Sequence, residues 1–152
     1  MNRRTLLRHA LAAPLAVGAP ATLRAAAPRL HVARSPSCGC CGAWVEHMRA
    51  AGFEPRVEMT ADDRLAALKA RLGLPGALWS CHTAQVEGYV VEGHVPAADA
   101  LRLLAERPVA LGLAVPGMPV GSPGMEMGAR VEPFDTLLVA RDGATAVFAE
   151  HR

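Results

Sequence analysis

The sequence has little of several features that mark common functional classes. It contains two Trp, one Tyr and three Phe in 152 residues, and no cluster of Lys and Arg with aromatic residues interleaved. Nucleic-acid-binding surfaces depend on such clusters, so we expect no nucleic-acid partner. The sequence also lacks a glycine-rich phosphate loop, a nucleophile elbow and paired carboxylates in a catalytic context. Kinase and hydrolase chemistry therefore have no support.

Long hydrophobic runs are absent beyond the first residues, and the N-terminal run is short. Residues 1–8 are basic, residues 10–23 are uncharged and rich in Ala and Leu, and residues 25–27 are all Ala. A basic, apolar and small-residue order is typical of a secretory signal peptide. A run of 14 residues is too short to span a bilayer as a helix.

The adjacent Arg3 and Arg4 favour twin-arginine export, with the general secretory route as the alternative. We expect a signal peptide over residues 1–27 and one periplasmic domain over residues 28–152, without membrane insertion after cleavage. All 14 acidic residues but only 12 of the 16 basic residues lie in that domain, which gives it a formal charge of −2.

The four cysteines are distributed unevenly. Cys38, Cys40 and Cys41 fall within four residues, and Cys81 follows forty residues later. In an oxidising compartment, two structural disulfides are the simplest interpretation. A structural disulfide gains most by closing a long loop, however, and neighbours such as Cys40 and Cys41 rarely bridge. The spacing favours metal binding or dithiol redox chemistry over plain disulfides.

Hydrophobic periodicity and turn residues predict seven elements followed by a hairpin. We expect strands over 29–34, 53–59, 83–87, 89–92, 136–140 and 145–148, and helices over 41–51, 62–72 and 96–107. Residues 109–132 form a Gly/Pro/Met-rich loop without clear periodicity. Within these elements we place Met48, Met59, Leu101 and Leu104 in the core. We expect the acidic residues of the second and third helices to be solvated. His151, near the end of the chain, is predicted to be disordered.

This order, β-α-β-α-β-β-α, predicts an α/β thioredoxin-like fold with a C-terminal hairpin. In that fold a Cys-x-x-Cys motif follows the first strand and opens the first helix, where Cys38 and Cys41 lie. The helix N-terminus stabilises a thiolate there. Cys81 and His82 occupy the place where related proteins carry a residue pair ending in cis-proline. The fold would therefore bring this pair against the first three cysteines.

Four sulfurs and an imidazole at one helix end suit a soft metal such as copper(I). Because Cys40 and Cys41 diverge, bridging thiolates shared between several ions would use them better than one tetrahedral ion. Zinc is less favoured, since a zinc site would call for two separated Cys-x-x-Cys pairs. The alternative is a thiol–disulfide oxidoreductase that uses Cys38 and Cys41.

Thioether and imidazole groups supply further candidate ligands. The Pro/Gly-rich loop contains Met118, Met125 and Met127. They are expected either to act as metal ligands or as a lid over the site, or to pack the loop onto the domain. His94 precedes the third helix and could complete the metal shell or cap that turn. His31 and His47 are interpreted as structural or solvated.

Four motifs in order resemble the CopG-like metal-binding family, also known as domain of unknown function 411. They are Ser35-Pro36-Ser37-Cys38-Gly39-Cys40-Cys41-Gly42-Ala43-Trp44, Ser80-Cys81-His82-Thr83-Ala84, Gly93-His94-Val95-Pro96 and the segment from Pro116 to Glu126. The resemblance implies an exported thioredoxin-like protein of copper resistance. It implies copper ligation by Cys38, Cys40, Cys41 and Cys81, with His82 or His94 nearby. We therefore expect metal ions, and other periplasmic copper proteins, as partners of a metal-binding protein rather than an enzyme.

Overall fold

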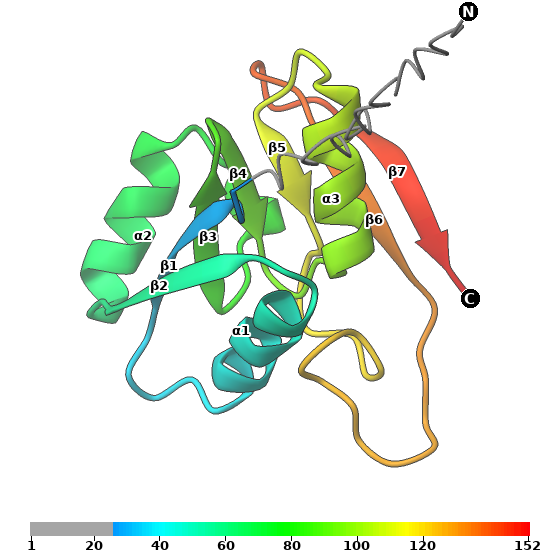
Figure 1. Ribbon diagram of the computed structural model, residues 1–152. Helices are drawn as coiled ribbons and strands as arrows, with labels where there is room; N and C mark the ends of the chain where they lie inside the picture. The colour runs from blue at the N-terminus through cyan, green and yellow to red at the C-terminus, as the bar shows by residue number, and fades with distance from the viewer. Residues whose placement is uncertain (1–25) are drawn as a thin grey trace, which may run out of the picture.

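The computed structural model describes residues 26–152 as a mixed α/β protein (Figure 1). The predicted signal peptide falls almost wholly on residues 1–25, outside the described part. The helices are α1 (Cys40–Ala50), α2 (Asp62–Arg71) and α3 (Ala97–Glu106), with a short 3-10 turn at Gly76–Leu78. The strands are β1 (Arg29–Arg34), β2 (Glu54–Met59), β3 (His82–Val86), β4 (Tyr89–Glu92), β5 (Gly112–Ala114), β6 (Phe134–Val139) and β7 (Thr145–His151).

All the strands join one seven-stranded sheet in the order β2-β1-β3-β4-β5-β6-β7. Strands β1 and β2 are parallel, as are β4 and β5, and the other neighbours are antiparallel. The predicted order of the first seven elements is therefore confirmed, apart from the added 3-10 turn. Each predicted helix and strand differs by at most a few residues at its ends.

The main core lies between one face of the sheet and helices α1 and α3. Trp44 and Met48 from α1 and Leu103 from α3 pack with Leu30 and Val91 from the strands. Alternation along β1 explains this, because Leu30 and Val32 face this core while His31 faces the opposite side and is exposed. Helix α2 packs on the opposite face, against β3.

The β3–β4 hairpin turns at Glu87 and Gly88, so Glu87 lies in the turn rather than at the end of the predicted strand. Both residues have positive φ, 46° and 88°. A two-residue turn with this backbone matches the right-handed twist of its strands. It places Thr83 opposite Glu92 in the ladder, and that pairing bears directly on the site described below.

Strand β5 is the main element that the sequence did not reveal. It has three residues inside the segment expected to be a loop, and it pairs with both β4 and β6. A Cβ at Gly112 would lie 1.8 Å from the carbonyl oxygen of Val90, so only glycine fits. Through β5 the C-terminal hairpin becomes part of the main sheet.

Several predicted side-chain positions are wrong. Met59 and Leu101 are 54% and 40% exposed, because β2 is an edge strand and Leu101 faces away from the core. Asp99 is buried rather than solvated, and it accepts a hydrogen bond from Thr136 Oγ1 at 2.6 Å. His151 is ordered in β7, with Nε2 2.9 Å from Asp99 Oδ2. Met48 is buried as predicted.

No helix within residues 26–152 is long and apolar enough to cross a bilayer.

Candidate metal centre

The cysteine-rich segment connects β1 to α1 in a tight turn. The Cys38 N–H donates to Ser35 O at 3.2 Å, and Arg34 Nη1 donates to Cys38 O at 2.6 Å. Helix α1 begins at Cys40, so Cys40 and Cys41 occupy its first turn. Here Cys38 and Cys41 are joined in a disulfide, while Cys40 and Cys81 are free thiols.

Cys81 approaches this segment from the start of β3. Its Sγ lies 3.9 Å from Cys40 Sγ, which in turn lies 3.6 Å from Cys38 Sγ. The Sγ of Cys41 is 3.8 Å from the Cys81 carbonyl oxygen. All four sulfurs lie within 4.8 Å of one another. Residues some forty positions apart thus meet in one cluster, as the predicted order of elements required.

Two buried imidazoles extend the cluster on the side of Cys81. The Nε2 of His94 lies 3.1 Å from Cys81 Sγ, and the Nδ1 of His82 lies 3.3 Å from it. His94 Nδ1 lies 2.8 Å from Pro123 O, a carbonyl that accepts the N–H. That hydrogen bond leaves a lone pair on Nε2, as in histidines oriented for metal binding. The Nε2 of His82 is buried without a hydrogen-bond partner among residues 26–152.

The two imidazoles are in the protonation state that binds metal, whereas the Cys81 thiol must first lose its proton. Burial, followed by the neighbouring His94 and Lys69, holds the pKa of His82 well below its ordinary value. Burial also lowers the pKa of His94. Burial and the adjacent Cys40 raise the pKa of Cys81 to about 11. The imidazoles are therefore neutral near pH 7, and a metal must displace the Cys81 proton.

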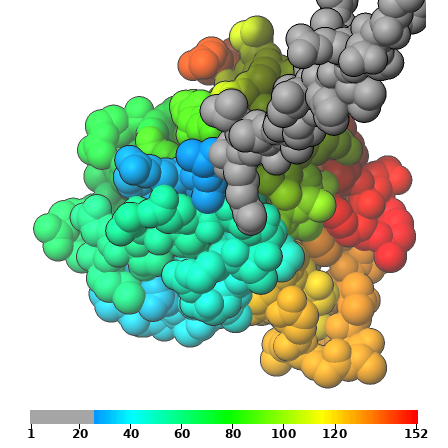
Figure 2. Space-filling model, in the orientation of Figure 1, coloured from blue at the N-terminus to red at the C-terminus, as the bar shows by residue number. Residues whose placement is uncertain are grey.

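The Pro/Gly/Met-rich loop packs against this cluster. In Figures 1 and 2 the yellow-to-orange segment after β5 runs beside α1. Ser80 Oγ donates to Gly117 O at 2.6 Å. A Cβ at Gly124 would lie 3.0 Å from Cys40 O and 2.7 Å from Trp44 N, so the loop touches the first turn of α1.

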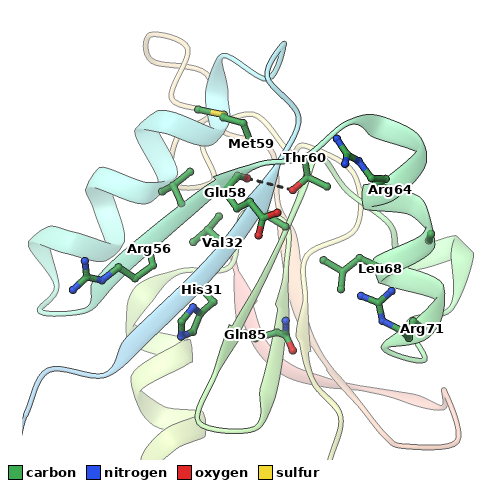
Figure 3. A pocket seen from close by; sticks show the side chains of 13 residues that line it. His31, Val32, Arg56, Glu58, Met59, Thr60, Arg64, Leu68, Arg71 and Gln85 are labelled. Carbon is green, nitrogen blue, oxygen red and sulfur yellow. Dashed lines mark hydrogen bonds between the residues drawn. The ribbon is translucent and has the colours of Figure 1, made fainter.

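A cavity of about 520 Å³ opens over the sulfurs. Its lining includes Cys38, Cys40, Cys81, Trp79 and Met118. Of the three candidate methionines, Met118 alone lines it, and Met127 is 63% exposed. A second and larger groove, about 800 Å³, lies between helix α2 and strands β1 and β2 (Figure 3). That groove is lined mainly by polar side chains and contains none of the candidate ligands.

Known families and solved structures include close relatives of this chain. Residues 78–125 match a family model described as "Protein of unknown function, DUF411". A structure named copper resistance protein copG, form 1, is 48% identical with a TM-score of 0.76, and the match covers 81% of this chain and 96% of that one. Form 2 is 45% identical with a TM-score of 0.77, covering 83% and 99%. No curated protein matches the chain.

The chain belongs to the CopG-like DUF411 family. The match to the family model includes Cys81, His82 and His94, three residues that the structure brings into contact. The family resemblance stated from the sequence motifs is thus confirmed. In this CopG-like protein, a cysteine and histidine cluster able to hold metal is in place.

Other predicted histidines lie away from this cluster. His31 is exposed on β1, at the larger groove. His47 Nε2 accepts the Ala97 N–H at 3.0 Å and joins α1 to the start of α3. Met125 is half-buried in the loop and does not line the cavity over the sulfurs.

In this CopG-like protein a buried charged pair, which the sequence did not predict, lies next to the cluster. Lys69 and Glu92 form an ion pair and are 3% and 0% exposed. The buried residues of α2 are Leu65 and Lys69. The burial of Lys69 could have been inferred from its four-residue spacing from Leu65, because positions i and i+4 share a helix face.

Proposed function

We propose that this protein is an exported copper(I)-binding protein of copper tolerance, which holds the metal in its cysteine and histidine cluster. The observation that carries the proposal is that four sulfurs lie within 4.8 Å of one another and that two neutral imidazoles contact one of them, the Sγ of Cys81. Its relatives are named copper resistance proteins. Thiolate and imidazole are the ligands that copper(I) takes in proteins.

The four sulfurs favour copper(I) over zinc. The ligand sulfurs in our proposal are those of Cys38, Cys40, Cys41 and Cys81, joined by the imidazoles of His82 and His94. Because Cys40 and Cys41 are sequence neighbours, thiolates shared between several copper(I) ions use the set better than one tetrahedral zinc. Met118 lines the same cavity and adds a thioether that binds copper(I) and not harder ions.

The Cys38–Cys41 disulfide makes metal capacity depend on redox state. A disulfide sulfur is not a thiolate ligand. Reduction by an external dithiol, which transfers two electrons and two protons, would release two thiols at the N-terminus of α1. Full copper binding in our proposal requires this reduced state.

The scaffold and location are part of the same proposal. The order β2-β1-β3-β4 with a Cys-x-x-Cys at the start of α1 supports a thioredoxin-like relationship. The signal-peptide pattern of residues 1–27 supports a periplasmic location for residues 28–152. Changing Arg3 and Arg4 together to Lys should stop twin-arginine export, measured by cell fractionation. Normal export of that variant would indicate the general secretory route.

A second candidate, a thiol–disulfide oxidoreductase, is favoured by the disulfide itself. Cys38 and Cys41 lie at the N-terminus of α1, a position typical of redox-active Cys-x-x-Cys motifs. Against it, Cys81 and His82 stand where a cis-proline would shape the substrate groove, and residues 26–152 contain no cis peptide bond. This alternative would be supported if the protein retained no copper but reduced the disulfide of another protein. The Cys38→Ser variant should then lose that reductase activity.

Anaerobic titration with copper(I) tests the proposal directly. Protein reduced with a dithiol and then desalted should bind more than one copper(I) per chain against a competing chelator, and it should release protons as thiols ionise. Protein with the Cys38–Cys41 disulfide intact is the matched control and should bind less. Equal binding by both forms, or none by the reduced form, would contradict the proposal.

A further inference from the structure

The buried network beneath the candidate metal centre is built around one carboxylate. Glu92 accepts hydrogen bonds from Lys69 Nζ, from the Ser80 N–H at 2.6 Å and from Thr83 Oγ1 at 2.6 Å. Lys69 Nζ also donates to Thr83 Oγ1 at 2.8 Å. Lys69 is the single lysine of the whole chain. Each polar atom named in these hydrogen bonds thus has a partner within the network.

Stability alone does not account for an ion pair in this place. Removing two charges from water costs several kcal/mol per ion, and their attraction repays that cost only in part. Apolar residues of similar volume are often as stable or more stable in such positions. The presence of this pair is therefore better explained by the segment that it holds in place.

Glu92 holds the segment that carries two candidate ligands. Its partners Ser80 and Thr83 lie on either side of Cys81 and His82. Gly93, the next residue, donates its N–H to His82 O at 3.1 Å, and a Cβ there would lie 2.7 Å from Ser80 Cβ. Strand β4 thus fixes residues 80–83 through a carboxylate and a close backbone contact.

We propose that the Lys69–Glu92 pair is a positioning element of the metal centre, which holds Cys81 and His82 against the cysteines of α1. The metal-binding part of this inference rests on the proposed function. The positioning part does not, because it concerns the distance between Cys81 and Cys40 in the metal-free protein. Lys69 also lines the cavity shared by Cys38, Cys40 and Cys81.

Two double variants separate positioning from charge. Lys69→Met with Glu92→Leu removes both charges and every hydrogen bond that these two side chains make to Ser80 and Thr83. Lys69→Met with Glu92→Gln also removes both charges but keeps an acceptor for the Ser80 N–H. Neither variant leaves a buried charge unpaired. A purely structural role predicts similar behaviour for the two, whereas positioning predicts that the Gln variant is rescued.

The first readout needs no metal. With the Cys38–Cys41 disulfide intact, Cys40 and Cys81 are the two free cysteines of the described chain. A short bifunctional alkylating reagent, fluorescent only after both arms have formed C–S bonds with loss of halide, reports their proximity. Cross-linking should fall in the Leu variant and return toward wild type in the Gln variant. Reaction of Cys40 with a one-armed reagent should not change.

The second readout is copper(I) retention by the reduced variants against a chelator. Partners that orient a ligand typically change metal affinity by about 10- to 100-fold, and we expect a loss in this range for the Leu variant. The matched control is Asp99→Leu, which removes another buried carboxylate, on α3, whose partners lie in β6 and β7. It should lower stability while leaving cross-linking and copper retention unchanged.

Wild-type cross-linking and wild-type copper retention in a folded Leu variant would overturn the inference. Reduced cross-linking together with a wild-type protein that binds no copper would leave the positioning role intact and reject the proposed function. If the Leu variant does not fold, Thr83→Val tests the same point. It removes one of the two flanking hydrogen bonds and keeps the ion pair, so unchanged cross-linking and retention in Thr83→Val would equally overturn the inference.

Discussion

Cys81 is the residue at which the two groups of candidate ligands meet. It belongs to the group of four sulfurs and also to the group formed with His82 and His94. Its sulfur is 3.9 Å from Cys40 Sγ on one side and 3.1 Å from His94 Nε2 on the other. Without this sulfur, the imidazoles would have no thiolate neighbour that links them to α1.

Replacing Cys81 therefore tests the cluster as a unit. Cys81→Ser should lower the number of copper(I) ions bound per reduced chain as much as Cys38→Ser does, because both remove a bridging thiolate. Copper content after anaerobic desalting measures this, with His31→Gln as an exposed control that should bind normally. A Cys81→Ser protein with wild-type copper content would show that Cys81 is not a ligand.

At the residue scale, the sequence predicted the meeting of Cys81 with Cys38–Cys41 because chain order alone fixes which segments adjoin in such a sheet. It did not predict Lys69 and Glu92. Charged residues are rarely fully buried unless paired, and the pairing here joins α2 to β4, which no local pattern reveals. The same reason explains Asp99, whose partners Thr136 and His151 lie in β6 and β7.

The loop between β5 and β6 is the element that closes over the candidate centre. Its carbonyl groups at Gly117 and Pro123 accept hydrogen bonds from Ser80 and His94. Proline and glycine content predicted an irregular segment, but it did not predict which methionine would line the cavity over the sulfurs. That choice depends on where the loop is fastened, which only the folded chain shows.

The methionines of this loop should therefore differ in effect. Met118→Leu conserves volume and apolarity, so the fold should persist. The variant should nevertheless hold copper(I) less tightly against a chelator, or change the rate at which copper(I) is transferred. Met127→Leu, at a position that does not line the cavity over the sulfurs, is the matched control and should behave as wild type. The triple change with Met125→Leu should lower stoichiometry little, because the thiolates remain. Unchanged retention and transfer in Met118→Leu would leave these methionines as packing residues.

The contact between α1 and α3 should respond to pH. His47 Nε2 accepts the Ala97 N–H, which only a neutral imidazole can do. Burial lowers the pKa of His47 from its ordinary value of 6.5, so the unfolded chain takes up this proton at a higher pH than the folded protein. The stabilising contribution is fully present above about pH 6.5 and is lost as the pH falls below it.

His47→Gln should accordingly flatten the pH dependence of stability. The free energy of unfolding of metal-free protein, measured by denaturant titration at about pH 7.5 and about pH 5.5, should fall less in the variant than in wild type. The other buried histidines are present in both proteins, so the difference isolates His47. An equal fall in both proteins would show that His47 does not carry this dependence.

For the molecule as a whole, a single sheet links the candidate metal centre to the C-terminal hairpin. The order of the first seven elements followed from hydrophobic periodicity and turn residues. The joining of the hairpin to the sheet did not, because β5 has three residues and its parallel pairing with β4 depends on contacts distant in sequence. Relatives at 48% and 45% identity are named copper resistance proteins, which agrees with the chemistry of the cluster.

The central claim is that this chain binds copper(I) through its cysteines. The most direct measurement is the metal content of protein isolated anaerobically from copper-grown cells, expressed as ions per chain alongside a free-thiol count. We predict more than one copper ion per chain, with zinc in the minority, and loss of most of that copper when Cys38, Cys40, Cys41 and Cys81 are all changed to Ser. Protein that carries no copper, or a fourfold variant that carries as much as wild type, would contradict the claim.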